Sequence, residues 1–229
     1  MTHLLSKSKY IRGLQCDRAL WLDVFNPRLA RYTAEQMRRF DRGREFEYSF
    51  KNTFPNGIDI SAELKRNVDA YPERTAQLLD GTGQSPFTSH LSPLTLFEAG
   101  FLYDDVLVLA DVVHKNADGT LDIYEVKSGN ALSKTYKRDA ALQHYVISHC
   151  RSINKFCIVY NGDNRFDTID LTEELVAQHD EIARNIAAMK EILSHGEPAT
   201  PTGQHCLEPY ACPYQHYCAQ GVRQMSLFG

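Results

Sequence analysis

The sequence predicts an α/β fold with a mixed central β-sheet and helices on its two sides. Three consecutive segments in the middle of the chain, residues 94–103, 105–114 and 121–127, have the composition of strands. A helical segment at 133–150 follows them, and two further β segments come after that helix. Strands that alternate with helices in this way are typical of a sheet covered by helices.

The N-terminal part is predicted to be helical, with helices at 6–25 and 33–53. In the second helix Phe46, Phe50 and Phe54 recur every four residues, which places them in one apolar stripe. The turn residues of "FPNG" end that helix. We expect the stripe to pack against the sheet.

The remaining elements are a β pair and a long helix. Residues 155–161 and 166–171 read as strands, and Thr172 can begin a helix that continues to Gly196. Residues 58–90 do not favour one type of element, apart from a loop at 80–86.

A chain of 229 residues is long enough for one good core with a small appendage. We therefore expect one domain, 1–229. It would have a helical N-terminal part at 1–57, a core of sheet and helix at 94–171 and a Cys-rich tail at 199–229.

Charge is distributed unevenly over this domain. The net charge is −4, but residues 1–44 carry ten Lys/Arg against four Asp/Glu. A basic N-terminal part on an acidic body could attract phosphate groups. The alternative is an ordinary solvated helix face.

The sequence has no apolar run as long as the roughly 18 residues of a membrane span, and it opens without the apolar core of a secretion signal. We expect no membrane association and a cytoplasmic location. Six cysteines in that compartment indicate thiols or metal ligands rather than disulfides.

The segments 105–114 and 121–127 form a predicted hairpin that brings acidic residues together. If its turn is centred on Asp118, Lys115 faces Leu121 and Asp111 faces Glu125. Like charges directly opposed on neighbouring strands are destabilising. Lys127 would emerge on the same face as Glu125.

A divalent cation between these acids would remove the repulsion, and hard oxygen ligands suit Mg²⁺ or Mn²⁺. Such an ion lowers the pKa of a bound water and neutralises charge on a phosphoryl oxygen, so the set fits phosphodiester hydrolysis with Lys127 as a catalytic group. The alternative is an exposed sheet face of mixed charge.

Asp111 followed on the next strand by Glu125-Val126-Lys127 resembles the PD-(D/E)XK nucleases. The following helix contains Gln143 and Tyr145 and is similar to the RecB-like branch, although that branch has Gln-x-x-x-Tyr and position 147 here is Ile. The resemblance runs from about residue 5 to 220 and implies a restriction-endonuclease-like core. It also implies that Gln143 positions the ion or the phosphate and that the Val126 carbonyl helps hold the ion.

The RecB-like branch also takes a metal ligand from a helix before the sheet. Glu47 stands four residues after Gly43 and beside the phenylalanine stripe, with Glu45 as the alternative. Glu98 on the first strand could contact the metal or orient Lys127. The alternative is that these residues are ordinary acids on a helix surface and at the end of a strand.

Four cysteines carry a second resemblance. Cys206, Cys212 and Cys218 recur with five residues between neighbours, and Cys16 lies far away in sequence. This arrangement is similar to RecB-like nucleases of the CRISPR-associated exonuclease type, in which one Cys before the core and three after it hold a 4Fe–4S cluster and join the chain ends. The family spacing of two residues between the first two tail cysteines differs here. Zinc, with His205 or His216 as substitute ligands, and free thiols therefore stay open.

Together these features predict a metal-dependent DNA nuclease. Its relatives imply an exonuclease that acts on single-stranded ends. Four arginines could guide the DNA backbone and Tyr145 could stack on an unpaired base; the arginines are Arg38, Arg39, Arg42 and Arg44. Protein partners in DNA repair or CRISPR adaptation are possible. The alternatives are a non-catalytic nucleic-acid-binding or scaffold protein and a zinc-containing RNA-processing nuclease.

Overall fold

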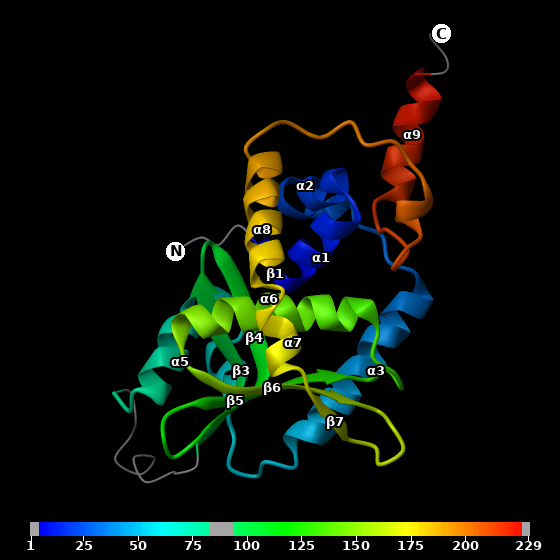
Figure 1. Ribbon diagram of the computed structural model, residues 1–229. Coiled ribbons are helices and arrows are strands. Elements are labelled where there is room, and N and C mark those ends of the chain that lie inside the picture. The colour runs from blue at the N-terminus through cyan, green and yellow to red at the C-terminus, as the bar shows by residue number, and fades with distance from the viewer. Residues whose placement is uncertain (1–4, 83–93, 226–229) are drawn as a thin grey trace.

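The computed structural model describes residues 5–82 and 94–225, and these form the predicted α/β fold (Figure 1). Within the described residues a sheet of seven strands has the order β2-β3-β4-β5-β6-β7, and β1 pairs with β4 beside this path. The strands are β1 (Leu5–Ser6), β2 (Ile58–Asp59), β3 (Leu94–Tyr103), β4 (Val106–Lys115), β5 (Leu121–Lys127), β6 (Ile153–Tyr160) and β7 (Asp167–Asp170).

The sheet is mixed, as the sequence predicted. Strands β3, β4 and β5 form an antiparallel meander, β5 and β6 run parallel, and β6 and β7 are antiparallel. The parallel step from β5 to β6 is made by a crossover helix. The helices are α1 (Lys7–Gln15), α2 (Asp17–Phe25), α3 (Ala34–Lys51), α4 (Ile60–Leu64), α5 (Tyr71–Leu79), α6 (Lys134–Cys150), α7 (Thr172–Val176), α8 (His179–Leu193) and α9 (Gln215–Met225), with 3-10 turns η1 (Pro27–Leu29), η2 (Val68–Ala70) and η3 (Gln204–Cys206).

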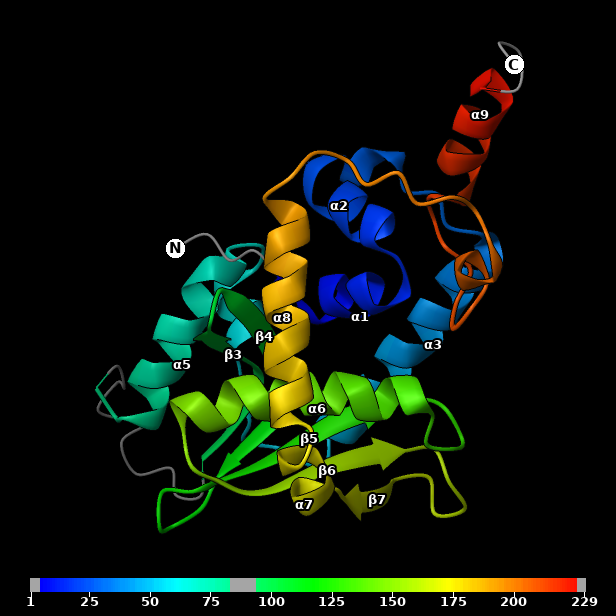
Figure 2. The ribbon, with the colours of Figure 1, turned by 45° about the horizontal axis from the view of Figure 1, so that its top comes forward.

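Helices cover both faces of the sheet. The crossover helix α6 lies across one face, with α1 and α8 packed beyond it (Figure 2). On the other face Phe50 of α3 packs against Phe97 and Val126, so the predicted phenylalanine stripe does contact the sheet. Burial of apolar side chains against both faces is the main force that holds this three-layer arrangement.

Helix α3 begins with a capping box. The Thr33 side chain accepts from the Gln36 backbone N–H at 3.2 Å, and Gln36 Oε1 accepts from the Thr33 N–H at 2.8 Å. These bonds satisfy two of the N–H groups that have no partner within the first turn of a helix. The helix then runs from the C-terminal tail to the sheet (Figure 2).

Two predicted helices are broken in the structure, and a helix in the tail and two short strands were not predicted. The helix predicted at 6–25 is broken at Cys16, which is extended (φ −167°, ψ 125°), and the helix after Thr172 is broken between α7 and α8. The tail contains the helix α9, for which no periodic pattern was recognised. Strands β1 and β2 have two residues each, too few to produce a pattern.

Residues 1–4, 226–229 and most of the predicted loop at 80–86 lie outside the described residues. None of the helices in the described part of the chain combines the length and the apolar character that crossing a membrane requires.

The C-terminal tail is bound to the N-terminal helices by hydrogen bonds, whereas the predicted metal cluster between them stays a prediction. Gln15 Nε2 donates to the carbonyl oxygens of both His205 and Tyr210, each at 2.7 Å. The Tyr214 hydroxyl donates to Asp23, and Gln36 Nε2 donates to the Ala211 carbonyl at 3.0 Å. Side-chain bonds from α1, α2 and α3 therefore fix a segment that has little regular structure of its own.

Close packing of β3 against α5 makes Gly100 sensitive to substitution. An added Cβ would lie 2.5 Å from the Tyr71 Cβ and 2.8 Å from the Tyr71 carbonyl carbon, and backbone cannot move aside easily. We expect Gly100→Ala to lower the free energy of unfolding by about 1–3 kcal/mol, measured by urea denaturation.

The matched control is Gly43→Ala in α3, where the nearest atom to an added Cβ is Ser128 Oγ at 4.0 Å. A glycine inside a helix costs about 0.5–1 kcal/mol relative to alanine, so this variant should gain stability. Equal stability of the two variants would contradict the close approach of α5 to β3.

Candidate metal centre

The predicted hairpin register is confirmed as far as the ladder extends. Lys115 pairs with Leu121, and the last pair is Val112 with Tyr124. Asp111 and Glu125 come directly after that pair, at the point where β4 and β5 separate. The other end of β4 pairs instead with β1, at Leu5 and Val106. On the edge of β4 away from β3, the neighbour is therefore β5 at one end and β1 at the other. Asp111 lies in the gap between β5 and β1.

The neighbouring strand β3 is distorted at the same level. Glu98 has a left-handed backbone (φ 54°), and Glu98 and Asp111 are left out of the otherwise continuous pairing of β3 with β4. Side-chain alternation shifts by one residue there: Ala110 and Val113 face the α6 side, although a regular strand would put them on opposite faces. The distortion frees both acids from the regular alternation.

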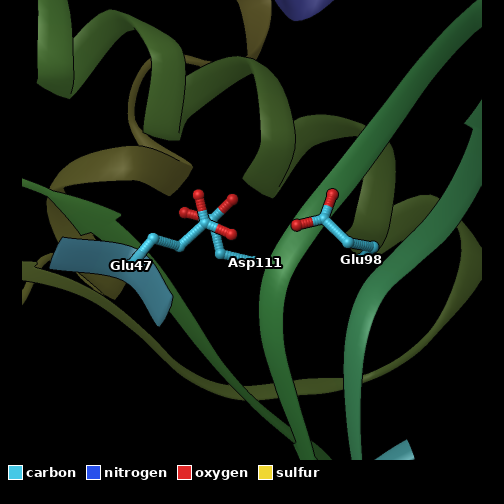
Figure 3. Close-up of side chains that lie close together, drawn as sticks. All are labelled: Glu47, Glu98 and Asp111. Atoms are coloured by element: carbon cyan, nitrogen blue, oxygen red, sulfur yellow. The ribbon is translucent and has the colours of Figure 1, made fainter. Parts of the chain in front are cut away.

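Three carboxylates meet at this distortion. Glu47 from α3, Glu98 from β3 and Asp111 from β4 each offer a ligand atom, and these atoms all lie within 4.8 Å of one another. Figure 3 shows the carboxylates of Glu47 and Asp111 together, with that of Glu98 directed toward them from the next strand. Among the described residues this is the one group of three or more His, Cys, Asp or Glu side chains that meets this distance. Glu45 is exposed and outside it, so Glu47 is the better placed of the two alternatives.

Lysines bind each of these acids. Lys51 Nζ lies 2.5 Å from Glu47 Oε1 and 2.6 Å from Glu98 Oε1. Lys7, the first residue of α1 and so next to β1, donates to Glu125 at 3.0 and 3.2 Å and lies 3.7 Å from Asp111 Oδ1. The gap between β4 and β5 is thus filled by a positive charge.

Lys127 contacts the same Glu125 oxygen as Lys7 and also a carboxylate of α6. Its Nζ lies 2.5 Å from Glu125 Oε1 and also donates to Asp139 of α6. The remaining oxygen of Asp139, Oδ1, is buried and has no hydrogen-bond partner among the described residues. Lys127 is therefore held between a strand carboxylate and a helix carboxylate.

The charges in this group do not balance. Among the described residues the ion pairs above connect five carboxylates with three lysines, which leaves two negative charges uncompensated. The pKa of Asp111 is raised to about 7 by burial and by the Glu125 charge, against the lowering effect of Lys7. Burial raises the pKa of Glu47 as well, with Lys51 opposing it. For Glu125, burial acts upward, but Lys127 and Lys7 outweigh it and the pKa is lowered.

Gln143 lies beside the same group. Its side chain is fully buried, and neither Oε1 nor Nε2 has a hydrogen-bond partner of normal geometry among the described residues. It is nevertheless near enough to Glu125 to help lower the pKa of that carboxyl. A buried amide without partners is costly, so this position calls for a polar ligand.

Val126 contacts the group through its backbone. Its N–H donates to Asp111 Oδ2 at 2.7 Å. This bond fixes the direction of the Asp111 carboxylate. The predicted role of the Val126 carbonyl stays a prediction.

The predicted nucleic-acid contacts fall into two groups. The four arginines of α3 are exposed, and Arg39 stacks over the Tyr210 ring at 4.5 Å while Arg44 pairs with Asp41. Tyr145, in contrast, is only 7% exposed and packs against Tyr103 and His149. Its ring has no free face for a base, so the predicted stacking role is corrected.

Two of the four predicted cluster cysteines, Cys16 and Cys212, pack in one apolar cluster with Leu22 of α2 and Tyr214 of the tail. Burial raises the pKa of the Cys16, Cys212 and Cys218 thiols, and the charges of other cysteines in the group raise it further. The Cys212 N–H donates to the Cys206 carbonyl at 2.8 Å. No three of these described sulfurs lie within 4.8 Å of one another, whereas ligands of a tetrahedral zinc are about 3.8 Å apart.

Sequence reasoning missed Lys7, Lys51 and Asp139. Two of them could have been recognised from their spacing in the sequence. Lys51 follows Glu47 by four residues and Asp139 precedes Gln143 by four, which places each pair on one helix face. Lys7 could not have been recognised in this way, since it reaches the site only through the pairing of β1 with β4.

No family model and no curated protein matches this chain. The chain is similar to a solved structure titled "Crystal structure of SSO0001", with 12% sequence identity and a TM-score of 0.47. The match covers 94% of this chain and 85% of that chain. At that identity and TM-score the likeness assigns no function.

The raised pKa of Asp111 predicts a stabilising substitution. A carboxyl whose pKa is higher in the folded state than in the unfolded state destabilises the fold as pH rises from about 4, and the full effect is present above pH 7. Asparagine keeps an acceptor for the Val126 N–H and has no charge. We expect Asp111→Asn, without metal at pH 8, to raise the melting temperature by at least about 2–4 °C, and to have no such advantage near pH 4.

The matched control is Asp122→Asn. Burial acts to raise the pKa of Asp122, but hydrogen bonds from Asn116 and Asn154 and the nearby Lys155 lower it. Its charge therefore stabilises the fold at neutral pH, and the same substitution should lower the melting temperature at pH 8 and matter less as pH falls toward 3. Parallel behaviour of the two variants would contradict the opposite charge environments.

Proposed function

We propose that this protein is a metal-dependent nuclease that hydrolyses phosphodiester bonds in DNA. The main observation in support is that Glu47, Glu98 and Asp111 each offer a carboxylate oxygen, and these oxygens lie within 4.8 Å of one another. Gln143 is fully buried beside Glu125 and has no hydrogen-bond partner of normal geometry among the described residues, which supports the same site. The Asp111 and Glu125-x-Lys127 arrangement, with its resemblance to PD-(D/E)XK nucleases, supports the choice of reaction.

The donor set fits a Mg²⁺ or Mn²⁺ ion. All candidate side-chain ligands are carboxylate oxygens, which hard divalent cations prefer, and the group has two negative charges more than its lysines balance. Asp111, Glu47 and Glu98 would hold the ion, with Glu125 and the Val126 carbonyl beside them. When bound, the ion would activate a water and neutralise charge on the phosphoryl group.

The chain's own groups supply orientation and charge. Lys127 is fixed between Glu125 and Asp139, so its ammonium is presented in a set direction and can stabilise negative charge on a phosphate oxygen in the transition state. Asp139 acts on Lys127 as a positioning residue. Gln143 can donate from Nε2 to a phosphate oxygen or accept from a water.

The preference for single-stranded ends, and so an exonuclease, rests on the resemblance to CRISPR-associated exonucleases. That resemblance also suggests protein partners in DNA repair or CRISPR adaptation. None of the six cysteines forms a disulfide in the structure, and we propose a cytoplasmic location. A non-catalytic nucleic-acid-binding or scaffold protein remains the alternative function.

We further propose that Cys16, Cys206, Cys212 and Cys218 bind a 4Fe–4S cluster. Four thiolates are the usual ligands of such a cluster, and the packing of Cys16 with Cys212 and the backbone bond from Cys212 to Cys206 support the proposal. A cluster holds its irons inside the ligand set and accepts thiolates farther apart than a single zinc does. His205 Nε2 lies 3.6 Å from Cys206 Sγ, and zinc with a histidine ligand is the alternative.

We expect Mn²⁺- or Mg²⁺-dependent cleavage of labelled DNA, with single strands preferred over duplexes. Asp111→Ala and Lys127→Ala should reduce the rate by at least about 10²-fold, because each removes a charge that acts on the reacting phosphate. Gel analysis of end-labelled oligonucleotides, with and without EDTA, measures this.

A matched pair on α3 controls this experiment. Glu47→Gln should lower the rate, whereas Glu45→Gln, an exposed acid two residues away, should not. Binding without cleavage by the wild type would favour the non-catalytic alternative. Equal rates for wild type, Asp111→Ala and Lys127→Ala would reject the proposed site.

The cluster makes its own prediction. Protein purified without oxygen should be brown and contain about four irons per chain. Cys212→Ala should lose the colour and most of the iron, while Cys150→Ala, at a thiol on α6 that bonds the Leu102 carbonyl, should keep both. Stoichiometric zinc without iron in the wild type would refute the cluster.

A further inference from the structure

Helix α3 and the residues just before it expose large apolar side chains. Phe40 is 43% exposed and Tyr48 is 67% exposed, with Met37 and Tyr32 exposed nearby. The Tyr32 and Phe40 rings meet edge to face, with centroids 5.7 Å apart. Large apolar side chains gathered on one exposed surface of a small protein generally mark a binding surface.

These residues lie on a side of α3 next to the one that bears Glu47. Phe40, Arg44 and Tyr48 are spaced by four residues, and Glu47 follows Phe40 by seven, close to two full turns. Met37, Phe40 and Tyr48 within α3 and Tyr32 just before it form an exposed group beside the ligand set, which we call the aromatic stripe. Phe40 and Tyr48 are about 12 Å apart along the helix axis, enough for more than one stacked base.

The surroundings of the stripe are positively charged. Between residues 28 and 44 the chain has six arginines and two acidic residues. Arg44 lies in line with Phe40 and Tyr48, and its guanidinium is exposed although it pairs with Asp41. This charge suits a phosphate backbone and would repel most other basic surfaces.

We propose that the aromatic stripe stacks on unpaired bases of a single strand whose backbone leads to Glu47 and Asp111. Exposed rings with interspersed arginines are what proteins use to bind single strands without reading their sequence. The rings could not reach the bases of a duplex, which are already stacked on one another. The statement that the strand leads to Glu47 and Asp111 rests on the proposed function. Stacking on the aromatic stripe would make the site selective for single strands.

The test is fluorescence anisotropy with a labelled thymidine oligonucleotide in EDTA, where cleavage cannot occur. Phe40→Ala and Tyr48→Ala should each weaken binding by at least about fivefold, and Phe40→Trp should bind as wild type does. Phe25→Ala, at a ring of α2 that is 49% exposed and outside the stripe, should have no effect. These side chains are exposed, so the variants should fold.

An abasic oligonucleotide of the same charge separates stacking from phosphate binding. Wild type should bind it more weakly than the thymidine strand, and Phe40→Ala should bind the two about equally. Unchanged affinity of Phe40→Ala and Tyr48→Ala for the thymidine strand would overturn the inference. So would a homodimer that Phe40→Ala dissociates, since a second copy would then cover the stripe.

Cleavage assays on the same samples keep the two proposals apart. If wild type binds through Phe40 and Tyr48 but never cleaves with Mn²⁺, the inference of base stacking holds and the proposed nuclease activity is rejected. If wild type cleaves and both alanine variants bind and cleave as well as wild type, the proposed nuclease activity holds and the inference of base stacking is rejected.

Discussion

The structure depends on three lysines that neutralise carboxylates where β4 leaves β5. Acids at this density, several of them buried, could not be kept in a folded chain without partners of opposite charge. Lys7, Lys51 and Lys127 come from α1, α3 and β5, so the charge balance also ties three separate elements to one point of the sheet. The balance is incomplete, and burial together with the neighbouring Glu125 charge raises the pKa of Asp111 to about 7.

Helix α3 connects most of the features described. One side, with Phe50, packs on the sheet; an adjacent side carries Glu47 into the ligand set; and the next side exposes Phe40 and Tyr48. A helix that serves three environments cannot show a clean division into apolar and polar faces. Its apolar stripe was nevertheless visible, because the phenylalanines recur every four residues.

The sequence was most informative where local rules apply. The turn at Asp118 set the hairpin register, and the helical period placed Glu47 beside Phe46 and Phe50, on a side that can reach the sheet. The sequence was least informative where contacts between distant segments determine which residues reach the site. Two residues of β1 carry no recognisable pattern, yet they bring Lys7 into the site. The positive φ of Glu98 is uncommon for any residue with a side chain, so nothing in its identity indicated it. Tyr145 was misjudged because its spacing from Gln143 turns it away from the site into the core.

The bonds from Gln15 to the carbonyls of His205 and Tyr210 span about 190 positions of the chain. During synthesis the first two helices leave the ribosome long before the segment that completes their packing. Until then Cys16 has none of its three distant neighbours, and the surface that later receives Tyr214 is open. Assembly of this end of the molecule is therefore a late event in biosynthesis, and incorporation of any group shared by the two ends would be post-translational.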